Sequence, residues 1–282
     1  MIMQVEIDFN KSIESNASSY YDKGKEAKAK AERIQQAIEV IEYRLSQLDK
    51  QIKQKQEIKQ APKKWHEKFH WFFSSNGFLV LAGRDMKSNE LLIKRYMKPD
   101  DLYFHAEIQG AAHCIVKTEG NEVDEETKKE AAVFAANFSK AWASGLSSID
   151  VYSVKPEQVS KQAPTGTSLS TGAFMIYGKR EWFRNISLGI AIGIEKKDDY
   201  YKVISGPKAA IKKHSAISFE IFRGEKKKSE IAQELRGLFE KNLNLRLATS
   251  IDEIVSMLPA SNLEIGKRLD KVSNTSVLTI ND

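Results

Sequence analysis

Apolar residues recur at alternating spacings of four and three through the first part of the chain. They stand at Ile13, Ala17, Tyr20, Gly24, Ala27, Ala31, Ile34, Ile38, Ile41, Leu45, Leu48 and Ile52. This heptad pattern predicts one long helix whose apolar seam is buried against another helix, as in a coiled coil. Ser12 is the expected N-cap, and Pro62 marks the expected end. The sequence predicts no second helix of this kind, so we expect the partner to be a second copy, another chain or a helix outside this sequence.

Two apolar runs that are rich in aromatic residues, 69–73 and 78–81, flank the dipeptide Asn76-Gly77. Both residues of an Asn-Gly pair accept positive φ angles, so the pair predicts a hairpin with a two-residue type I′ turn. The runs are apolar nearly throughout and do not alternate. The hairpin is therefore expected to be buried on both faces, or to present its outer aromatics to a partner.

Period-two patterns predict strands along the rest of the chain, and amphipathic stretches predict helices. The expected strands are 102–108, 114–117, 149–154, 173–177, 188–194, 200–204 and 217–222. The expected helices are 89–97 with Ser88 as cap, 124–143 stopped by Gly145, 207–213, 226–242 and 251–257. Runs of strands with few packed helices indicate an α+β fold, here a long N-terminal coiled-coil helix followed by a mixed β-sheet domain with packed helices.

Four segments follow from these patterns. We expect a coiled-coil arm at 1–62, a globular domain at 63–197, an α+β extension at 198–260 and a polar, flexible tail at 261–282. Cys114 is the single cysteine and excludes an intramolecular disulfide. No apolar run approaches the roughly 18 residues that a membrane span needs, and no signal peptide opens the chain. We therefore expect a soluble, cytoplasmic protein with no membrane contact.

The net charge of +6 favours an anionic partner, but only weakly. Residues 1–62 carry 11 Lys and Arg against 10 Asp and Glu, residues 63–197 carry 19 against 16, and residues 198–282 carry 14 against 12. Because no part of the chain is strongly basic, any nucleic-acid site must be a local patch on one face.

The residues that could form a metal or catalytic site do not occur in a known pattern. The metal candidates are His66, His70, His105, His113 and Cys114, and they include neither a CxxC nor an HExxH motif. No nucleophile elbow or phosphate-binding glycine loop accompanies the serines. The sequence therefore predicts no metal, no cofactor and no catalytic residue, so we expect a protein that is not an enzyme.

The stretch 154–184 combines basic, hydroxyl and aromatic residues in a segment shaped by proline and glycine. Its cations are Lys155, Lys161, Lys179, Arg180 and Arg184, and its aromatics include Tyr177, Trp182 and Phe183. RNA-binding surfaces use this combination, with cations on phosphates and rings on unpaired bases. The same residue types are common in ordinary solvated loops, so composition alone leaves both interpretations open.

Four ordered motifs resemble the NFACT-R domain, the predicted RNA-binding module of the NFACT family of ribosome-associated quality control factors. They read WHEKFHWFFSSNGFLVLAGRDMKSNELLIKRYM from Trp65, DLYFHAEIQGA from Asp101, VKPEQVSKQAPTG from Val154 and GAFMIYGKR from Gly172. Residues 7–32 are similar to the coiled-coil arm of archaeal members, and the resemblance covers about residues 4–240. Ser153, Thr167, Ser168 and Glu181 depart from the residues that are usual in the family.

The resemblance implies a non-catalytic module that binds RNA and the large ribosomal subunit obstructed by peptidyl-tRNA. Family members mark or help elongate the stalled nascent chain. The family's NFACT-N domain, its helix-hairpin-helix element and the first helix of its coiled-coil hairpin are not found in this sequence. We expect that half in cis in a longer protein or in trans.

Chemistry assigns roles to the residues in and near these motifs. We expect phosphate contacts from Arg84, Lys155, Lys161, Lys179, Arg180 and Arg184, hydrogen bonds to sugar or base edges from His105 and Gln158, and stacking by Trp65, Trp71 or Trp182, of which Trp71 is more typical of a core. Charge reversal at Lys161 and Lys179 together is expected to weaken RNA binding while the fold survives. A competing hypothesis is a coiled-coil adaptor that binds protein partners without contacting RNA.

Overall fold

A computed structural model describes residues 6–55, 62–162, 168–197 and 200–269. The chain divides into two compact units, Met1–Glu57 and Ile58–Asp282. The first unit is dominated by α1 (Ile13–Lys55), which confirms the predicted long helix. Ser12 caps it as expected, because the amide of Ser15 donates to the Ser12 hydroxyl at 3.2 Å.

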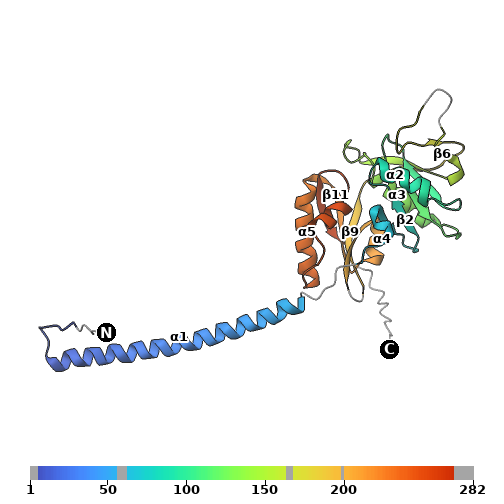
Figure 1. Ribbon diagram of the computed structural model, residues 1–282. Helices are drawn as coiled ribbons and strands as arrows, with labels where there is room; N and C mark the ends of the chain where they lie inside the picture. Colours follow the sequence, from blue (N-terminus) through green and yellow to red (C-terminus); the bar gives the residue numbers. More distant parts are fainter. Residues whose placement is uncertain (1–5, 56–61, 163–167, 198–199, 270–282) are drawn as a thin grey trace, which may run out of the picture. The chain divides into compact units, whose positions relative to one another are not determined.

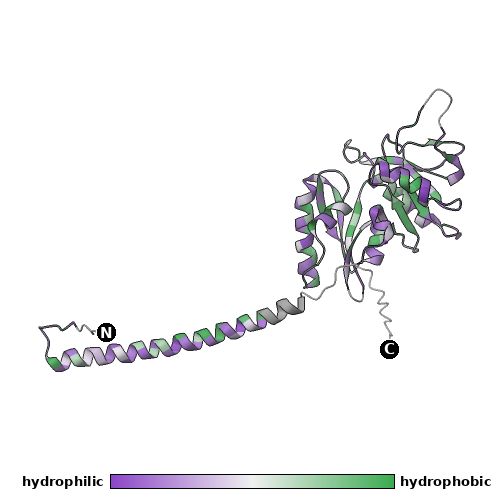
Figure 2. Cartoon of the chain, in the orientation of Figure 1, coloured by the Kyte–Doolittle hydropathy of each residue, from purple (hydrophilic) through white to green (hydrophobic). Residues whose placement is uncertain are grey.

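Within the first unit, the described residues of the α1 seam are open to solvent. Ile34 is 51% exposed, Ile41 55% and Leu45 56%. Apolar and polar residues alternate along the helix (Figure 2). A helix of this length that leaves such a seam in water lacks the burial that normally stabilises it, so the need for a helical partner remains a prediction.

The second unit begins with a six-stranded sheet in the order β1-β2-β4-β3-β5-β8. Its strands are β1 (His70–Phe73), β2 (Leu79–Ala82), β3 (Leu102–Ala106), β4 (Cys114–Lys117), β5 (Ser148–Val154) and β8 (Glu181–Ser187). Short helical segments connect or precede them, namely η1 (Trp65–Lys68), α2 (Met86–Leu91), η2 (Leu92–Tyr96), α3 (Glu125–Asn137) and η3 (Pro156–Gln158). A two-stranded ribbon of β6 (Val159–Ser160) and β7 (Met175–Ile176) lies within the connection from β5 to β8.

A four-stranded sheet in the order β10-β9-β11-β12 completes the second unit (Figure 1). Its strands are β9 (Ile190–Lys196), β10 (Tyr201–Gly206), β11 (Ile217–Lys226) and β12 (Leu263–Arg268), accompanied by α4 (Lys208–His214), α5 (Lys228–Leu243) and α6 (Ile251–Met257). The α+β class is confirmed. Every described strand pair is antiparallel, so the predicted mixing of strand directions is not found.

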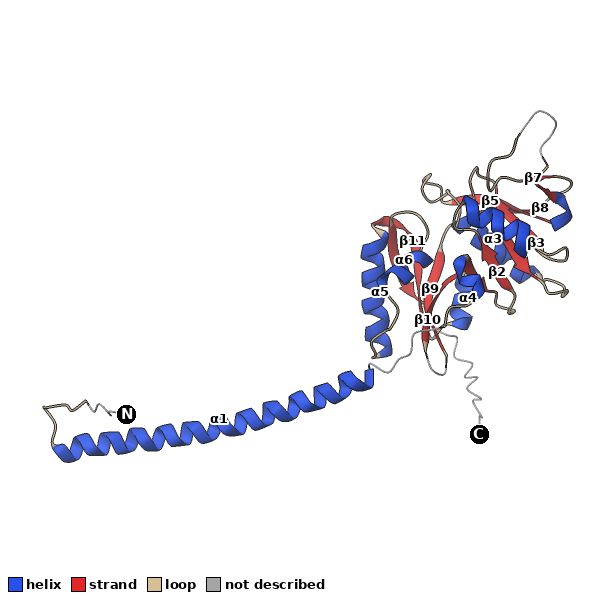
Figure 3. Ribbon diagram, in the orientation of Figure 1, coloured by secondary structure: helices blue, strands red, loops and turns tan. Residues whose placement is uncertain are grey.

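The two faces of the six-stranded sheet are covered by different elements. On one face Phe72, Phe104 and Val116 pack against alanines and Phe134 of α3, which Figure 3 shows lying across the strands. On the other face Trp71, Tyr103 and Tyr152 join a core that continues into β9, β11 and α5. The large apolar residues of the hairpin are therefore buried on both faces, as expected.

The hairpin forms, but its turn is not type I′. Only Gly77 has a positive φ, 91°, and the amide of Ser74 bonds the carbonyl of Phe78 at 2.8 Å across a five-residue loop. Polar residues of α3 hold this loop, because Ser75 donates its amide to Glu130 at 2.8 Å and Thr127 donates to the hydroxyl of Ser74 at 3.1 Å. These distant contacts override the local preference of the Asn-Gly pair.

Three further expectations about helices and their ends are corrected. The helix predicted at 89–97 begins at Met86, because Asp85 rather than Ser88 is its N-cap and accepts from the Ser88 amide at 2.7 Å. The helix predicted to reach 143 ends at Asn137, whose side chain accepts from the amide of Gly189 at 2.8 Å and ties that end to the chain before β9. Gly145, with φ 78°, ends the following turns and not the helix.

Three described strands lie outside the predicted ones. The predicted loop 154–184 contains β6 and the first part of β8, the edge strand beside β5. Residues 261–282 were assigned to a flexible tail, yet Leu263–Arg268 forms β12 because it pairs with β11 and buries Leu263. The four-stranded sheet begins with β9, so its first strand lies within the segment predicted as the globular domain at 63–197. Residues 270–282 lie outside the described part of the chain.

Candidate nucleic-acid interface

Strand β8 places basic and aromatic side chains side by side at the edge of the six-stranded sheet. Trp182 lies opposite Tyr152 in the register of β8 with β5, and their rings are 5.4 Å apart. Arg180 lies 4.4 Å from the Tyr152 ring, and Arg184 lies 3.9 Å from the Trp182 ring. Because side chains alternate along a strand, Trp182 and Arg184 share one face. Arg180, just before β8, lies against the rings of Tyr152 and Trp182 on that face. We call Tyr152, Arg180, Trp182 and Arg184 the β8 face.

The two arginines of the β8 face differ in their charge partners. Arg184 donates to Asp150 at 2.6 Å, and its side chain is 60% exposed. The backbone amide of Asn185 and the Arg184 guanidinium together hold the pKa of Asp150 below its ordinary value. Arg180 forms no ion pair with a carboxylate among the described residues and is held by the two rings alone. Stacking leaves the edge donors of a guanidinium free, so Arg180 can bind a phosphate.

His105 is half-buried in a cluster of rings that includes Tyr152 of the β8 face. Its ring lies 5.2 Å from His113 and 5.8 Å from Tyr152. Burial, assisted by neighbouring His113, lowers the pKa of His105 to about 3, so its imidazole is neutral at pH 7. Its Nδ1 is buried without a hydrogen-bond partner among the described residues. The neutral ring supports Tyr152 and carries no charge toward a phosphate.

Lys161 has structural partners for its ammonium protons. Its Nζ donates to the carbonyl of Ser170 at 2.9 Å and of Ala173 at 3.1 Å, and it lies 3.4 Å from Glu90. Glu90 also accepts from the amide of Gly172 at 2.8 Å. We call this set of contacts among Glu90, Lys161 and residues 170–173 the Glu90 latch. It joins the segment before β7 to α2.

Gln158 is used in a similar way. Its Nε2 donates to the carbonyls of Tyr177 at 2.7 Å and Lys179 at 2.9 Å, and its Oε1 accepts from the amide of Lys155 at 3.0 Å. Both amide protons are therefore occupied, and one lone pair remains for a ligand. Lys155 and Lys179 project from the two segments that Gln158 joins, and both side chains are exposed. The neighbouring motif residue Gly166 lies outside the described residues.

Arg84 and Trp65 lie elsewhere. Arg84 follows β2, and three strands stand between β2 and β8 in the sheet, a spacing of about 19 Å. Its guanidinium donates to the carbonyls of Glu67 at 3.2 Å and Phe69 at 3.1 Å. Trp65, on η1, is 51% exposed and stacks on Tyr96 at 5.1 Å. The structure therefore gathers His105, Lys155, Gln158, Lys179, Arg180 and Arg184 near β8. It holds Lys161 against α2 through Glu90 and leaves Arg84 and Trp65 at a second place. Trp71 is core, 3% exposed.

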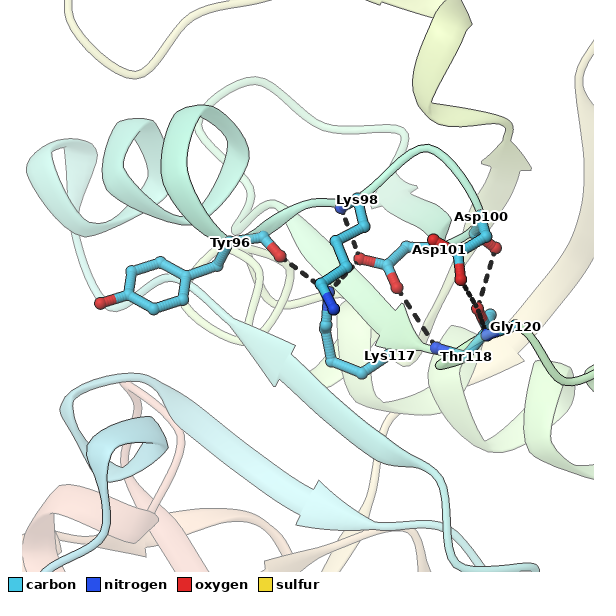
Figure 4. Close-up of polar contacts among 7 residues, drawn as sticks. All are labelled: Tyr96, Lys98, Asp100, Asp101, Lys117, Thr118 and Gly120. Atoms are coloured by element: carbon cyan, nitrogen blue, oxygen red, sulfur yellow. Dashed lines mark hydrogen bonds and ion pairs between the residues drawn. The ribbon is translucent and has the colours of Figure 1, made fainter.

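A buried ion pair fixes the chain that carries Tyr96 (Figure 4). Lys117 pairs with Asp101, with side-chain exposures of 9% and 0%, and donates to the Tyr96 carbonyl at 2.8 Å. Asp101 also accepts from the amides of Lys98 at 2.7 Å and Thr118 at 3.2 Å. A buried pair with its remaining hydrogen bonds satisfied holds a single geometry, so the position of the Tyr96 ring is well defined.

Sequence reasoning missed three residues that complete these arrangements. Glu90 lies in a segment expected to be only a short helix, although its spacing of four from Lys94 was a visible ion-pair signal. Tyr152 and Tyr96 carry the ring contacts of Arg180 and Trp65, and only the fold pairs them.

The described part of the chain contains neither a membrane-spanning helix nor a candidate metal site. No helix there is long and apolar enough to cross a membrane. No group of three or more His, Cys, Asp and Glu side chains among the residues described is placed to hold a metal ion.

Comparisons with known proteins bear on the family of the chain. Residues 68–178 match the family model described as the NFACT protein RNA binding domain. The archaeal Rqc2 homolog aRqcH of Methanocaldococcus jannaschii is 41% identical over 207 residues, which cover 73% of this chain and 30% of that protein. The ribosome quality control complex subunit NEMF homolog of Drosophila melanogaster is 38% identical over 70% of this chain and 20% of its own length.

The human ribosome quality control complex subunit NEMF is 38% identical over 60% of this chain and 16% of its own length. The matched segment thus spans less than a third of each of these three relatives. The matched family model describes an RNA-binding domain and not a catalytic one.

Proposed function

Because the chain carries an NFACT RNA-binding domain of the Rqc2/NEMF family, we propose that it binds structured RNA through the β8 face. The observation that carries this proposal is the arrangement of Arg180 and Arg184 on the rings of Tyr152 and Trp182. Ring stacking fixes the Arg180 guanidinium without using its edge donors, and Arg184, which donates from one nitrogen to Asp150, keeps its remaining donors, so both cations are preorganised for phosphate oxygens. Exposed Lys155 and Lys179 extend the same basic surface.

The partner that these features suit is the large ribosomal subunit carrying a stalled nascent chain attached to tRNA. Two of the named relatives are ribosome quality control complex subunits, and a phosphate-binding surface without a base-specific pocket suits rRNA or tRNA backbone. The NFACT-N half of the family, in cis in a longer protein or in trans, would supply what this segment lacks. No chemical step is assigned to the chain.

Binding of labelled tRNA by the full chain across a salt titration tests the proposal. Phosphate contacts predict that affinity falls linearly with the logarithm of salt concentration. Replacement of Arg180 and Arg184 by Gln is expected to weaken binding by about tenfold or more and to flatten the salt slope by about two. The matched control removes the same charge from exposed Lys129 and Lys140, which have no ion-pair partner in the described chain. Equal affinities for the two variants would contradict the assignment.

Co-sedimentation with purified large ribosomal subunits tests the partner. We expect the wild-type chain to be retained and the Arg180→Gln, Arg184→Gln variant to be lost at the same salt concentration. Equal retention of the wild type and the variant would instead favour contact through ribosomal protein.

The exposed seam of α1 supports a second candidate, a coiled-coil adaptor. In that case the globular unit would bind protein, and the chain would retain its partners after the arginines of the β8 face are replaced. A coiled-coil homo-oligomer is one form that such an adaptor could take.

A further inference from the structure

A cleft of about 430 Å³ opens beside η1, away from the β8 face. Its walls come from η1, the end of β2, β10 and α6, and include Lys64, Trp65, Lys68, Arg84, Lys202 and Met257. The volume lies within the range of about 300–1,000 Å³ that is typical of ligand sites. We call it the η1 cleft. It lies where the six-stranded sheet meets the C-terminal sheet.

The charge of the η1 cleft is not balanced by its own carboxylates. Glu67 is occupied by an ion pair with Lys202 and by the amide of Lys64 at 2.7 Å. Glu253 caps α6 and accepts from the amide of Ser250 at 3.0 Å. Lys64, Lys68 and Arg84 form no ion pair with a carboxylate in the described chain, so the walls are left net positive.

Lys228, on α5, is a further cation close to Arg84. Burial lowers the pKa of Arg84, and burial together with the nearby Arg84 charge lowers the pKa of Lys228. An anion that approaches both cations offsets the cost of burying Arg84 and its unfavourable effect on the charge of Lys228. The polar surroundings of Arg84 supply only backbone carbonyls, from Glu67 and Phe69.

An aromatic wall stands next to these cations. The rings of Trp65 and Tyr96 are nearly parallel, with an angle of 7°, and Lys68 lies 4.2 Å from the centre of the Tyr96 ring. The backbone carbonyl of Tyr96 accepts a hydrogen bond from Lys117 at 2.8 Å (Figure 4). Trp65 is thus a supported indole that is half-exposed, with one face on Tyr96, an edge contact to His66 and the exposed part of its surface open to a ligand. Such a ring stacks well on an unpaired base.

Two buried ring nitrogens without partners among the described residues lie just beyond. A neighbouring cleft of about 280 Å³ shares Lys64 and Lys202 with the first and is also lined by His66 and Trp71. The Nε2 of His66 and the Nε1 of Trp71 are buried without a hydrogen-bond partner among the described residues. His66 is 4% exposed and Trp71 3%. Orphaned buried polar atoms are uncommon and suggest that a ligand or an ordered water satisfies them.

We infer that the η1 cleft binds an unpaired nucleotide of a single-stranded RNA segment, with its base on Trp65 and its phosphate on Lys64, Lys68 and Arg84. This inference rests on the proposed RNA-binding function and adds a second contact site to it. The β8 face carries guanidinium groups already stacked on protein rings, so it suits RNA backbone. The η1 cleft has an open ring beside unneutralised cations, so it suits RNA whose bases are not paired.

The test compares two probes on the full chain, a fluorescein-labelled oligoadenylate and a duplex RNA of equal length. Trp65→Leu is expected to weaken oligoadenylate binding by about tenfold, the effect of losing one stacked base, and to change duplex affinity by less than about twofold. Tyr43→Leu is the matched control, because it removes a ring that is 66% exposed on α1. Equal unfolding midpoints would confirm that each variant is folded.

A second variant tests whether the lysines of the η1 cleft contact the phosphate. Lys64→Gln with Lys68→Gln is expected to reduce the salt slope for oligoadenylate by about two. The Arg180→Gln, Arg184→Gln variant, in contrast, is expected to weaken both probes.

Two outcomes separate the failure of the cleft from the failure of the proposed function. If wild type binds both probes and Trp65→Leu binds oligoadenylate as tightly as wild type does, the cleft assignment is wrong and the β8 face stands. If wild type binds neither probe at any salt concentration, both assignments fall.

Discussion

Side-chain partners separate the basic residues around β8 into those that can bind phosphate and those that hold the protein together. Lys179 is exposed and has no ion-pair partner among the described residues. Lys161 donates to two carbonyls and pairs with Glu90. The two lysines look equivalent in the sequence, but a carboxylate at position 161 would face Glu90 and leave two carbonyls without their donor.

Lys179→Glu alone is expected to weaken tRNA binding by several-fold while leaving the unfolding midpoint unchanged. Lys161→Glu is expected to lower the free energy of unfolding by about 1–3 kcal/mol, because like charges meet in the Glu90 latch. Denaturant titration of each variant separates the two effects. The double charge reversal is therefore not the clean test of RNA binding that the sequence suggested. An unchanged stability of Lys161→Glu would show that the latch is dispensable.

His70 illustrates a different residue-scale effect, the cost of burying an imidazole. Its ring stacks on Phe138 at 4.1 Å. Burial, with smaller contributions from Arg84 and Lys228, lowers its pKa to about 3. The unfolded chain protonates this ring below its ordinary pKa of about 6.5, whereas the folded protein does not do so until about 3. Stability contributed by the neutral ring is therefore lost as the pH falls between these values.

We expect the free energy of unfolding to fall between pH 7 and about pH 4.5, and to fall by about 2 kcal/mol less in His70→Phe than in wild type. His105, whose pKa is also about 3, contributes in the same direction and remains in both proteins. Urea unfolding of both proteins at the two pH values measures the difference. Parallel losses in the two proteins would show that His70 is not protonated on unfolding in this range.

At the scale of elements, the Glu90 latch fixes the segment before β7 against α2. The hydrogen bond from Lys94, followed by that from the Gly172 amide, lowers the pKa of Glu90 to about 2, so it is ionised at neutral pH. Gly172 has a φ of 77°, and a Cβ there would lie 2.7 Å from the carbonyl oxygen of Met86. This close approach, which glycine permits, brings the Gly172 amide to the carboxylate.

Glu90→Ala is expected to raise amide hydrogen exchange at Gly172 by about tenfold, because a bond to a charged acceptor is lost. Glu125→Ala is the control, since that residue is 68% exposed and pairs with Lys128 at the surface. If the exchange rate at Gly172 does not change in Glu90→Ala, the latch does not order this segment.

Helix α1 gives a second prediction at the scale of elements. If the partner of its seam is a second copy, the full chain should associate, and Ile38→Lys with Leu45→Lys should abolish association by placing charges in the seam. Val40→Lys with Tyr43→Lys alters exposed residues away from the seam and should leave it unaffected. Sedimentation equilibrium of the wild type and the two variants at one concentration measures their association. A wild-type chain that stays monomeric would rule out a second copy as the partner.

At the scale of the whole molecule, the six-stranded and four-stranded sheets of the second unit share one core. Trp71 and Tyr103 belong to the same buried cluster as Ile192, Ile221 and Leu235. Lys213 and His214 donate to the carbonyls of Ser75 at 2.6 Å and Ser74 at 2.8 Å. The hairpin thus joins both sheets, and we expect them to unfold in one transition.

Gly206→Ala should lower the free energy of unfolding of both sheets equally, by about 1–2 kcal/mol. Its Cβ would lie 3.0 Å from atoms of Phe72, whereas a Cβ at Gly237 would meet nothing within 4 Å, so Gly237→Ala is the control. Tryptophan fluorescence reports the six-stranded sheet, and hydrogen exchange at Ile192 and Ile221 reports the other. A loss confined to one probe would show that the sheets unfold separately.

The sequence by itself determined the features that depend on local periodicity and composition. The seam from Ile13 onward predicted α1, and Asn76-Gly77 between two apolar runs predicted the hairpin. The ordered motifs from Trp65 to Arg180 indicated the NFACT-R domain. Such features are readable because neighbours in the sequence are also neighbours on a helix or across a turn.

Only the tertiary structure decided which side chains meet. Lys161 and Glu90 are 71 residues apart in the chain. Residues 181–187 form a strand because they pair with β5. Trp65 gains its platform from Tyr96, and Arg84 is separated from the other predicted cations by the strand order. A side chain's free donors and its charge depend on such distant partners, and spacing along the sequence carries no information about them.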